Sequence, residues 1–381
     1  MEQGYNIGII GAGPAGCTAA LYLQDKNGVT LLDFSTPMRT VLPTGGGRCN
    51  LANAEYDFRE LAKNYPRGEK FLYSIFSKFA TADTVEFFEK LGIETYIQED
   101  MRIFPKSNES KEVQTKFIKA LNKTTIKKEQ ALRIENEGDK IKVVTDYNSY
   151  TFDKLIIAIG GHSNYEMLKR IGISLTPIYP SLVGLMSREN FREISGIVLK
   201  DIISKDTRLE GDILFTHYGI SGPLIYKISS IKVKDSFPYT LSFKLVKEDI
   251  DLQNLFNNNP HKQIHTLLGE IIPKNFANNL LQKININTEL KCHKITKDIR
   301  EKIENELYNF TVTITGTKKD GETVTSGGVD LKKVNPKTLE STESPNIYFC
   351  GEILDVDGFC GGFNLQNCWS TGYVVAKAIN N

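Results

Sequence analysis

The sequence predicts an α/β fold with a parallel sheet built from both ends of the chain and a second domain inserted between them. Three apolar runs predict the sheet. Residues 7–10 lead into glycines in G-x-G-x-x-G order, residues 154–161 end in paired glycines, and residues 347–350 precede the last helical stretch. Continuous apolar runs of this length are typical of strands that are buried on both faces of a parallel sheet.

The first stretch, residues 5–33, has the pattern of a dinucleotide-binding strand–helix–strand unit. Gly11 permits the tight turn after the strand, Gly13 lets backbone amides approach a pyrophosphate, and Gly16 lets the helix pack closely. The helix N-terminus supplies free N–H groups for the phosphates. Asp33 ends the second apolar run, where a carboxylate can accept hydrogen bonds from a ribose. A merely structural turn is disfavoured because strand, helix and acid are all in place.

A glycine-rich loop follows at residues 44–50, Thr-Gly-Gly-Gly-Arg-Cys-Asn. Three consecutive glycines are costly to order, so a chain usually keeps them where the backbone passes close to another group. Arg48 and Asn50 add a cation and an amide beside the glycines. We expect this loop to lie along the same cofactor. The alternative, a flexible surface loop, fits the Arg-Cys-Asn composition less well.

The region from residue 55 to residue 152 alternates between helical and strand patterns. The sequence predicts helices within 55–92, with a stop at Gly92, a turn at 102–107, a helix over 112–122 and a meander of short strands at 130–135, 141–146 and 150–152. Lysines 116, 119, 123, 127 and 128 are interpreted as a solvated helix face.

Residues 187–327 are predicted to form the inserted domain, a β-barrel that itself carries a helical insert. Strand patterns occupy 194–203, 211–215, 239–245 and 310–315, whereas residues 250–306 are polar, helical and rich in Asn and Lys. His261 and His265 are four residues apart and could place two imidazoles on one helix face as metal ligands. Because no carboxylate or cysteine accompanies them, a solvated helix face is favoured and no metal is expected.

The last stretch contains a second glycine cluster. Asp355 and Asp357 follow the third apolar strand, and Gly361 and Gly362 lead into a helix that begins near Asn364. A glycine pair before a helix N-terminus forms an anion-binding group of amides. A flavin enzyme can use such a helix start to stabilise the negative charge of a reduced ring. Two such clusters at opposite ends of one chain favour a flavin dinucleotide over ordinary turns.

Bulk properties limit the remaining possibilities. The 381 residues carry a net charge of +1, which gives no overall field toward nucleic acid or anionic lipid. Six scattered cysteines include no C-x-x-C pair, so a dithiol redox pair or a zinc ribbon is not indicated. We therefore expect a cytoplasmic protein with a small-molecule substrate and no nucleic-acid or membrane partner. The oligomeric state is left open.

Several motifs resemble those of the HI0933-like, BaiN-type FAD flavoproteins, a group that includes aminoacetone oxidase-like enzymes. The glycine loop at 44–50 is similar to the family's SGGGRCN, and residues 102–107 are similar to its FPxS segment. LFTHYGISGP at 214–223, VTSGGV at 324–329 and CGEILDVDGFCGGFNLQNCWSTGY at 350–373 also resemble family motifs. The resemblance spans nearly the whole chain. It implies a Rossmann-like FAD domain (1–186 and 328–381), a barrel domain (187–250 and 307–327) and a helical subdomain (251–306).

The resemblance also implies specific site residues. Those expected to contact FAD are Gly11, Gly13, Pro14, Ala15, Gly16, Asp33, Gly46, Gly47, Arg48, Ala131 (through its backbone), Gly160, Gly351, Glu352, Asp355, Gly362, Phe363, Asn364 and Leu365. Those expected to border the reacting ring are Arg48, Asn50, His217, Tyr218 and Asn364. For His217, a structural hydrogen bond is an equally good interpretation, and Cys49 is either a flavin-reactive thiol or a small buried hydrophobe.

The expected activity is FAD-dependent hydride transfer between NAD(P)H or a small organic substrate and an acceptor. Because no second G-x-G-x-x-G is present, NAD(P)H is expected only as a transient electron donor. Three alternatives stay open: an amine oxidase of the aminoacetone oxidase type that uses O₂, a flavin-binding protein that supports RNA modification without its own turnover, and an NAD(P)-only dehydrogenase.

Overall fold

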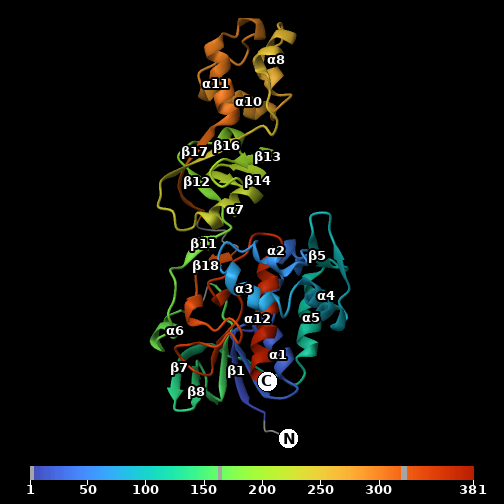
Figure 1. The fold of residues 1–381 in the computed structure, drawn as a ribbon, viewed down its shortest axis with the longest axis vertical. Coiled ribbons are helices and arrows are strands. Elements are labelled where there is room, and N and C mark those ends of the chain that lie inside the picture. Colours follow the sequence, from blue (N-terminus) through green and yellow to red (C-terminus); the bar gives the residue numbers. More distant parts are fainter. Residues whose placement is uncertain (1–3, 162–164, 319–323) are drawn as a thin grey trace. The chain divides into compact units, whose positions relative to one another are not determined.

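The computed structural model describes residues 4–161, 165–318 and 324–381 (Figure 1). The chain divides into two compact units, Met1–Tyr179 with Val324–Asn381 (unit 1) and Pro180–Thr323 (unit 2). The sequence-based boundary at 186/187 is wrong for the start of the barrel. Strand β12 (Leu185–Ser187) pairs with two barrel strands and therefore belongs to unit 2, not to the Rossmann-like domain.

Unit 1 is built on a five-stranded sheet of order β19-β10-β1-β2-β6 in which every pairing is parallel. β1 (Asn6–Ile10) lies at the centre between β10 (Lys154–Ile157) and β2 (Gly28–Asp33), and β19 (Ile347–Phe349) forms one edge. These are the apolar runs predicted as strands. The parallel sheet built from both chain ends is confirmed.

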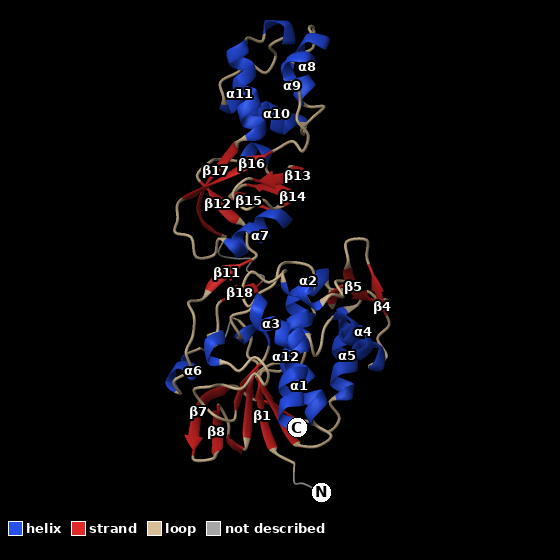
Figure 2. Cartoon of the chain, viewed as in Figure 1, coloured by secondary structure: helices blue, strands red, loops and turns tan. Residues whose placement is uncertain are grey.

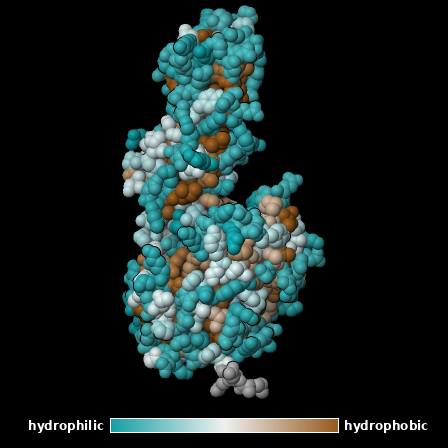
Figure 3. Space-filling model, viewed as in Figure 1, coloured by the Kyte–Doolittle hydropathy of each residue, from teal (hydrophilic) through white to brown (hydrophobic). Residues whose placement is uncertain are grey.

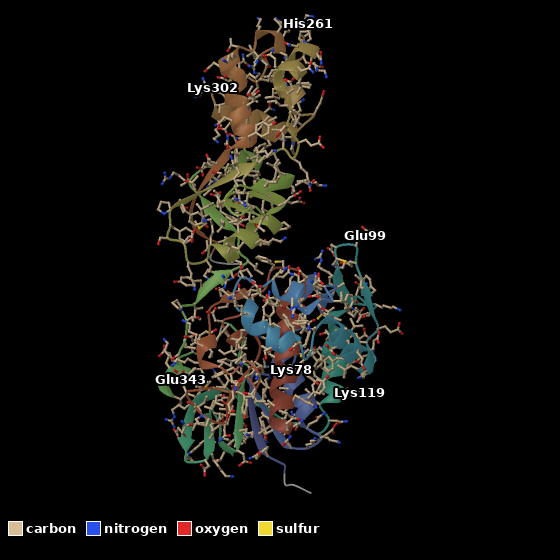
Figure 4. The ribbon with its side chains drawn as sticks, viewed as in Figure 1. Lys78, Glu99, Lys119, His261, Lys302 and Glu343 are labelled. Carbon is tan, nitrogen blue, oxygen red and sulfur yellow. The ribbon has the colours of Figure 1, made fainter. Side chains whose placement is uncertain are left out.

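The other edge strand, β6 (Thr125–Lys128), was not predicted. Its residues were assigned to a solvated helix face, but Lys127 and Lys128 lie on β6, and only Lys116 and Lys119 belong to the helix α5 (Ser110–Ala120). Figure 4 shows Lys119 at the surface of unit 1. Lysines on an edge strand are common because they oppose pairing with another chain. A polar edge strand has no apolar run to reveal it.

Helices α1 (Pro14–Leu23) and α12 (Phe363–Asn380) lie side by side on one face of the sheet (Figures 1 and 2). A meander of β7 (Ala131–Glu137), β8 (Lys140–Thr145) and β9 (Ser149–Phe152) packs on the other face, where the backbone of Gly8 lies against the Phe152 ring. The predicted meander is confirmed.

The remaining elements of unit 1 surround this sandwich. They include the helices α2 (Phe58–Ala62), α3 (Glu69–Phe76), α4 (Thr81–Lys90) and α6 (Glu166–Arg170), and an antiparallel sheet of β3 (Ala52–Asn53), β5 (Arg102–Pro105) and β4 (Thr95–Ile97). The predicted turn at 102–107 is wrong in its first part, because residues 102–105 form the central strand of that small sheet. The short strands β11 (Tyr179–Ser181) and β18 (Val324–Ser326) flank the insertion.

Unit 2 contains a closed barrel of order β12-β15-β14-β13-β16-β17, so the inserted β-barrel is confirmed. Its further strands are β13 (Val198–Ser204), β14 (Glu210–Thr216), β15 (Gly219–Ser221), β16 (Tyr239–Lys244) and β17 (Phe310–Thr317), with helix α7 (Pro223–Ile231). A helical segment lies between β16 and β17, formed by α8 (Leu252–Asn258), α9 (Ile264–Leu268), α10 (Lys274–Lys283) and α11 (Lys297–Tyr308). Its visible surface is mainly hydrophilic (Figure 3).

The histidine pair of the helical segment does not form the arrangement considered from sequence. His261 precedes α9 and lies beside His293, with ring centroids 6.0 Å apart, whereas His265 bonds the carbonyl oxygen of Thr288 through Nδ1 at 2.7 Å. Among the residues that the structure describes, no three His, Cys, Asp or Glu side chains are grouped as a metal site would require. Within the same residues, no helix combines the length and hydrophobicity that crossing a membrane demands.

Candidate functional site

The turn between β1 and α1 has the close contacts that its glycines predict. A Cβ on Gly11 would lie 2.3 Å from the carbonyl oxygen of Ala158, and one on Gly16 would lie 2.0 Å from that of Gly11. A Cβ on Gly13 would have only Thr40 Oγ1 nearby, at 3.7 Å. Thus Gly11 and Gly16 are needed for packing, whereas Gly13 leaves open space beside the N-terminus of α1, as a phosphate-binding turn requires.

The turn after β19 and the middle of helix α12 lie directly beside this turn. A Cβ on Gly351 would lie 2.7 Å from the Ala15 Cβ, and Gly351 N–H donates to Thr371 Oγ1 at 2.9 Å. Further along α12, a Cβ on Gly372 would lie 2.6 Å from the Ala15 carbonyl oxygen. Segments more than 300 residues apart in sequence therefore pack together at the first turn of α1, beyond the carboxyl end of β1.

The 44–50 loop lies in the same unit and is held in an unusual backbone conformation. Gly45, Gly46 and Gly47 all have positive φ angles, of 58°, 69° and 85°. No described atom would lie within 4 Å of a Cβ on Gly46, so this part of the loop is open. The Arg48 guanidinium stacks 4.1 Å from the centroid of the Phe104 ring, and its Nε donates to the Gly45 carbonyl at 3.2 Å.

Two predicted ring-bordering residues, Asn50 and Asn364, bond backbone groups. With its amide oriented to satisfy its neighbours, Asn50 accepts from Gly362 N–H at 2.9 Å and donates to the Ala52 carbonyl at 3.0 Å. Asn364 accepts from Gly358 N–H and donates to the Gly358 carbonyl, both at 2.8 Å. The Asn50 contact connects the 44–50 loop to the start of α12, and the Asn364 contacts hold the turn before the helix. A direct contact of either amide with a ligand stays a prediction.

The predicted ribose-binding carboxylate, Asp33, lies at the end of β2 and holds the first turn. Its Oδ2 accepts from Ala12 N–H at 2.7 Å, and its Oδ1 accepts from Ser35 N–H at 2.7 Å and from Ser35 Oγ at 2.8 Å. Each carboxylate oxygen can accept more than one hydrogen bond, so a ribose contact is compatible with this geometry. Ala131 begins β7, after the sheet edge that β6 forms beside β2.

The other predicted contacts lie at the carboxyl ends of β10 and β19. Gly160 follows β10 and has open space beside its Cα, whereas Gly161 packs against Thr325. Glu352 Oε1 accepts from Thr325 N–H at 2.8 Å, which ties the β19 turn to β18. Asp355 follows in the same turn, and its N–H donates to the Val329 carbonyl at 3.2 Å. Pro14, Phe363 and Leu365 lie in the first turns of α1 and α12.

His217 and Tyr218 belong to unit 2, where they form the two-residue turn between β14 and β15. The imidazole is exposed and lies edge-on to the phenol, with ring centroids 5.2 Å apart. The phenol packs against Gly184 and lies 5.4 Å from the Lys318 ammonium. Their predicted roles at the reacting ring stay predictions.

The buried cysteines of unit 1 have the properties of hydrophobic side chains. Cys49 is fully buried, and burial raises the pKa of its thiol from 9.0 to about 12, although a hydrogen bond with Thr44 opposes this. Burial likewise raises the pKa values of Cys17 and Cys350. A thiol with so high a pKa stays protonated and unreactive at neutral pH. The structure therefore favours the hydrophobic interpretation of Cys49.

A buried ion pair near the site was not predicted. The Arg67 guanidinium donates from Nε and Nη2 to both carboxylate oxygens of Asp357, which is fully buried. Arg67 precedes α3 in a stretch predicted only as helical, and nothing in its spacing indicates a carboxylate 290 residues away. Such a pair depends on tertiary packing alone. Asp357 had been noted, but only as a residue of the turn after β19.

The residues present fit the expected FAD. Helix α1 begins after Gly13 and helix α12 begins after Gly362, and α12 packs against Ala15 in the first turn of α1 through Gly372. Open space beside Gly13, Gly46 and Gly160 leaves the backbone accessible at each of these three positions. Helix starts with free amides favour phosphate and other anionic groups.

Comparison with known proteins identifies the family. The model of the HI0933-like protein Rossmann domain matches residues 5–378. The chain belongs to the HI0933-like family. It is thus a member of a family of FAD-dependent oxidoreductases, and the resemblance stated from its motifs is confirmed.

Two relatives align with almost the whole chain. Over 412 residues the chain is 29% identical to a 3-dehydro-bile acid delta(4,6)-reductase of Clostridium scindens, with 98% of each protein covered. Over 402 residues it is 30% identical to a ribosomal RNA dihydrouridine synthase of Haemophilus influenzae, again with 98% of each covered.

Solved structures show the same fold at low sequence identity. The quinol fumarate reductase FrdA of E. coli superposes with a TM-score of 0.51 at 13% identity, covering 99% of this chain and 70% of that one. The Sdh1 complex of Mycobacterium smegmatis gives 0.51 at 14% identity, covering 99% and 68%. At these identities the likeness concerns the fold alone.

Proposed function

We propose that this chain is an FAD-dependent reductase of a carbon–carbon double bond conjugated to a carbonyl group. The observation that carries the proposal is that relatives aligned over 98% of the chain are named for two such reductions. A delta(4,6)-reductase of a 3-dehydro bile acid acts on double bonds that are conjugated with the C3 ketone. Dihydrouridine is formed by saturating the ring double bond beside a uracil carbonyl. The substrates differ greatly, but the bond that is reduced is of one kind.

The described residues suit such a reaction through binding and orientation. Bound FAD supplies hydride transfer, and the polypeptide determines where that chemistry occurs. The open backbone at Gly13 and the N-terminus of α1 would receive the pyrophosphate. The N-terminus of α12, which begins at Phe363, would face the ring end of the cofactor and favour negative charge there. Reduction of the conjugated bond would add a hydride at one carbon, with its two electrons coming from NAD(P)H by way of the flavin, and a proton from solvent at the other carbon.

The electron donor in this proposal is NADH or NADPH bound transiently, because the chain has one G-x-G-x-x-G and no second dinucleotide unit in its sequence. The test is an anaerobic titration of the purified yellow protein, followed by its absorbance. We expect the flavin band to bleach with NADH or NADPH. It should then return when a conjugated acceptor is added, either a 3-oxo-4,6-diene steroid or a uridine-containing ribosomal RNA transcript.

Other outcomes of this titration would contradict the proposal. Bleaching only with small amines, with reoxidation only by O₂, would indicate an amine oxidase. Absence of reduction by any small donor would indicate a flavin-binding role in RNA modification, and a colourless protein would indicate an NAD(P)-only dehydrogenase. The variant G13A is the control for specific binding, since a Cβ there fits the fold but occupies the open space beside α1.

A further inference from the structure

The turn that begins α12 is held by a single continuous segment elsewhere in unit 1. The turn comprises residues 357–363 and the segment comprises residues 50–67. Besides the Asn50 contact with Gly362 N–H, the side chain of Asn53 donates to the Gly361 carbonyl at 3.2 Å. This segment therefore contacts the turn at successive backbone positions.

The same segment continues to bond the turn toward its other end. Phe359 N–H donates to the Asn64 carbonyl at 3.0 Å, and the buried Tyr65 hydroxyl donates to the Phe363 carbonyl at 2.6 Å. Hydrogen bonds at this many points fix the direction in which α12 starts. The position of the helix N-terminus thus depends on distant residues, such as Asn53 and Tyr65, as well as on the bonds of Asn364 within the turn.

One more contact joins the 50–67 segment to the 357–363 turn, the ion pair of Arg67 with Asp357. It differs from the others because both groups are charged. Asp357 lies six residues before Phe363, the first residue of α12, and is fully buried, so water screens its negative charge poorly. A helix N-terminus acts as about half a positive charge, which one nearby carboxylate would outweigh. The bidentate Arg67 guanidinium offsets that carboxylate. With the pair intact, the helix N-terminus can determine the local electrostatic field.

We infer that Arg67 is a positioning residue for the flavin: it neutralises Asp357 and fixes the 357–363 turn, so that the start of α12 presents a net positive field to the bound ring. The inference rests on the proposed function only in placing the flavin ring beside the start of α12. It assigns Arg67 no contact with substrate or with the reacting atoms.

The test compares the midpoint potential and FAD dissociation constant of the holoenzyme with those of R67M and D357N. Both variants break the pair, so both should weaken FAD binding about tenfold. Their potentials should shift in opposite directions. R67M leaves a buried negative charge and should lower the potential, whereas D357N leaves a positive charge and should raise it. A purely structural role would move both potentials in the same direction or neither.

Two further variants keep the test decisive if R67M folds poorly. R67K retains the charge but not the bidentate geometry, so FAD binding should weaken while the potential stays near that of the wild type. The exposed pair Lys90–Glu86 on α4 is the matched control, and E86Q should change neither quantity. A potential shift in R67K equal to that in R67M, or shifts of one sign in R67M and D357N, would overturn the inference alone. A wild-type protein that binds no FAD would overturn it together with the proposed function.

Discussion

At the scale of single residues, two glycines of the first turn are expected to have different roles, Gly13 in FAD binding and Gly16 in packing of the fold. Gly13 has room for a methyl group, whereas Gly16 has none because the Gly11 carbonyl lies 2.0 Å from the Cβ position. We expect G13A to change the free energy of unfolding by less than about 1 kcal/mol but to weaken FAD binding by about tenfold or more. G16A should destabilise the protein by about 1–3 kcal/mol.

Urea denaturation and FAD titration of the apo protein measure the two effects separately. The control is G28A, since a Cβ on Gly28 meets only the Tyr5 carbonyl oxygen at 3.9 Å. If G13A bound FAD as tightly as the wild type, the pyrophosphate would not approach α1 at this position.

The buried Cys49 thiol predicts how stability depends on alkaline pH. Its pKa is raised from 9.0 to about 12 in the folded protein, so the folded state holds a proton that the unfolded state releases. The stabilising contribution is therefore complete below pH 9 and is lost as the pH rises from 9 toward 12, at up to about 1.4 kcal/mol per pH unit. In C49A this part of the slope should be absent.

The measurement is urea denaturation of wild type and C49A at pH 8, 9 and 10. Differences between the proteins are compared, because other groups titrate in the same range. C360A is the matched control, since Cys360 is exposed. Equal slopes for wild type and C49A would show that the thiol is not held protonated by burial.

At the scale of secondary structure elements, the contact between α1 and α12 connects stability to cofactor binding. In an isolated helix, Gly→Ala stabilises by about 1 kcal/mol. At Gly372 the new methyl would lie 2.6 Å from the Ala15 carbonyl oxygen and 2.9 Å from Thr18 Cβ. We expect G372A to destabilise the protein by about 1–3 kcal/mol because the helices must separate, and to weaken FAD binding because Ala15 belongs to the first turn.

Thermal denaturation with and without FAD checks this prediction. Lys377 is exposed on the same helix, so K377A serves as the control and should be nearly neutral. A G372A protein more stable than the wild type would show that helix propensity, not packing, dominates at this position.

At the scale of the whole molecule, each compact unit has its own hydrophobic core. We expect calorimetry to show two unfolding transitions, with FAD raising only that of unit 1. A ligand at a thousand times its dissociation constant stabilises the folded state by about 4 kcal/mol. The variant F276A, in the core of unit 2, should lower the other transition by removing a ring that is 1% exposed. A shift of both transitions by FAD would contradict this division.

Local patterns were sufficient to predict much of this architecture. Apolar runs revealed the buried strands β1, β2, β10 and β19 because a strand covered on both faces must be apolar throughout. They did not reveal β6, whose lysines resemble a solvated helix, or β5 within the expected turn. Both strands are short, and their conformation depends on pairing with neighbouring strands. The hydrophobic periodicity of a segment carries no information about such pairing.

The sequence by itself determined the strand–glycine–helix unit at the N-terminus, the second glycine cluster, the inserted barrel and the family. Each depends on residues close together in the chain, where sterics and hydrophobic period act locally. Only the tertiary structure decided that Gly351 lies against Ala15, that Asn50 bonds Gly362, and that Arg67 pairs with Asp357. These contacts join residues hundreds of positions apart, and they form only when strand order and helix packing bring the two chain ends together.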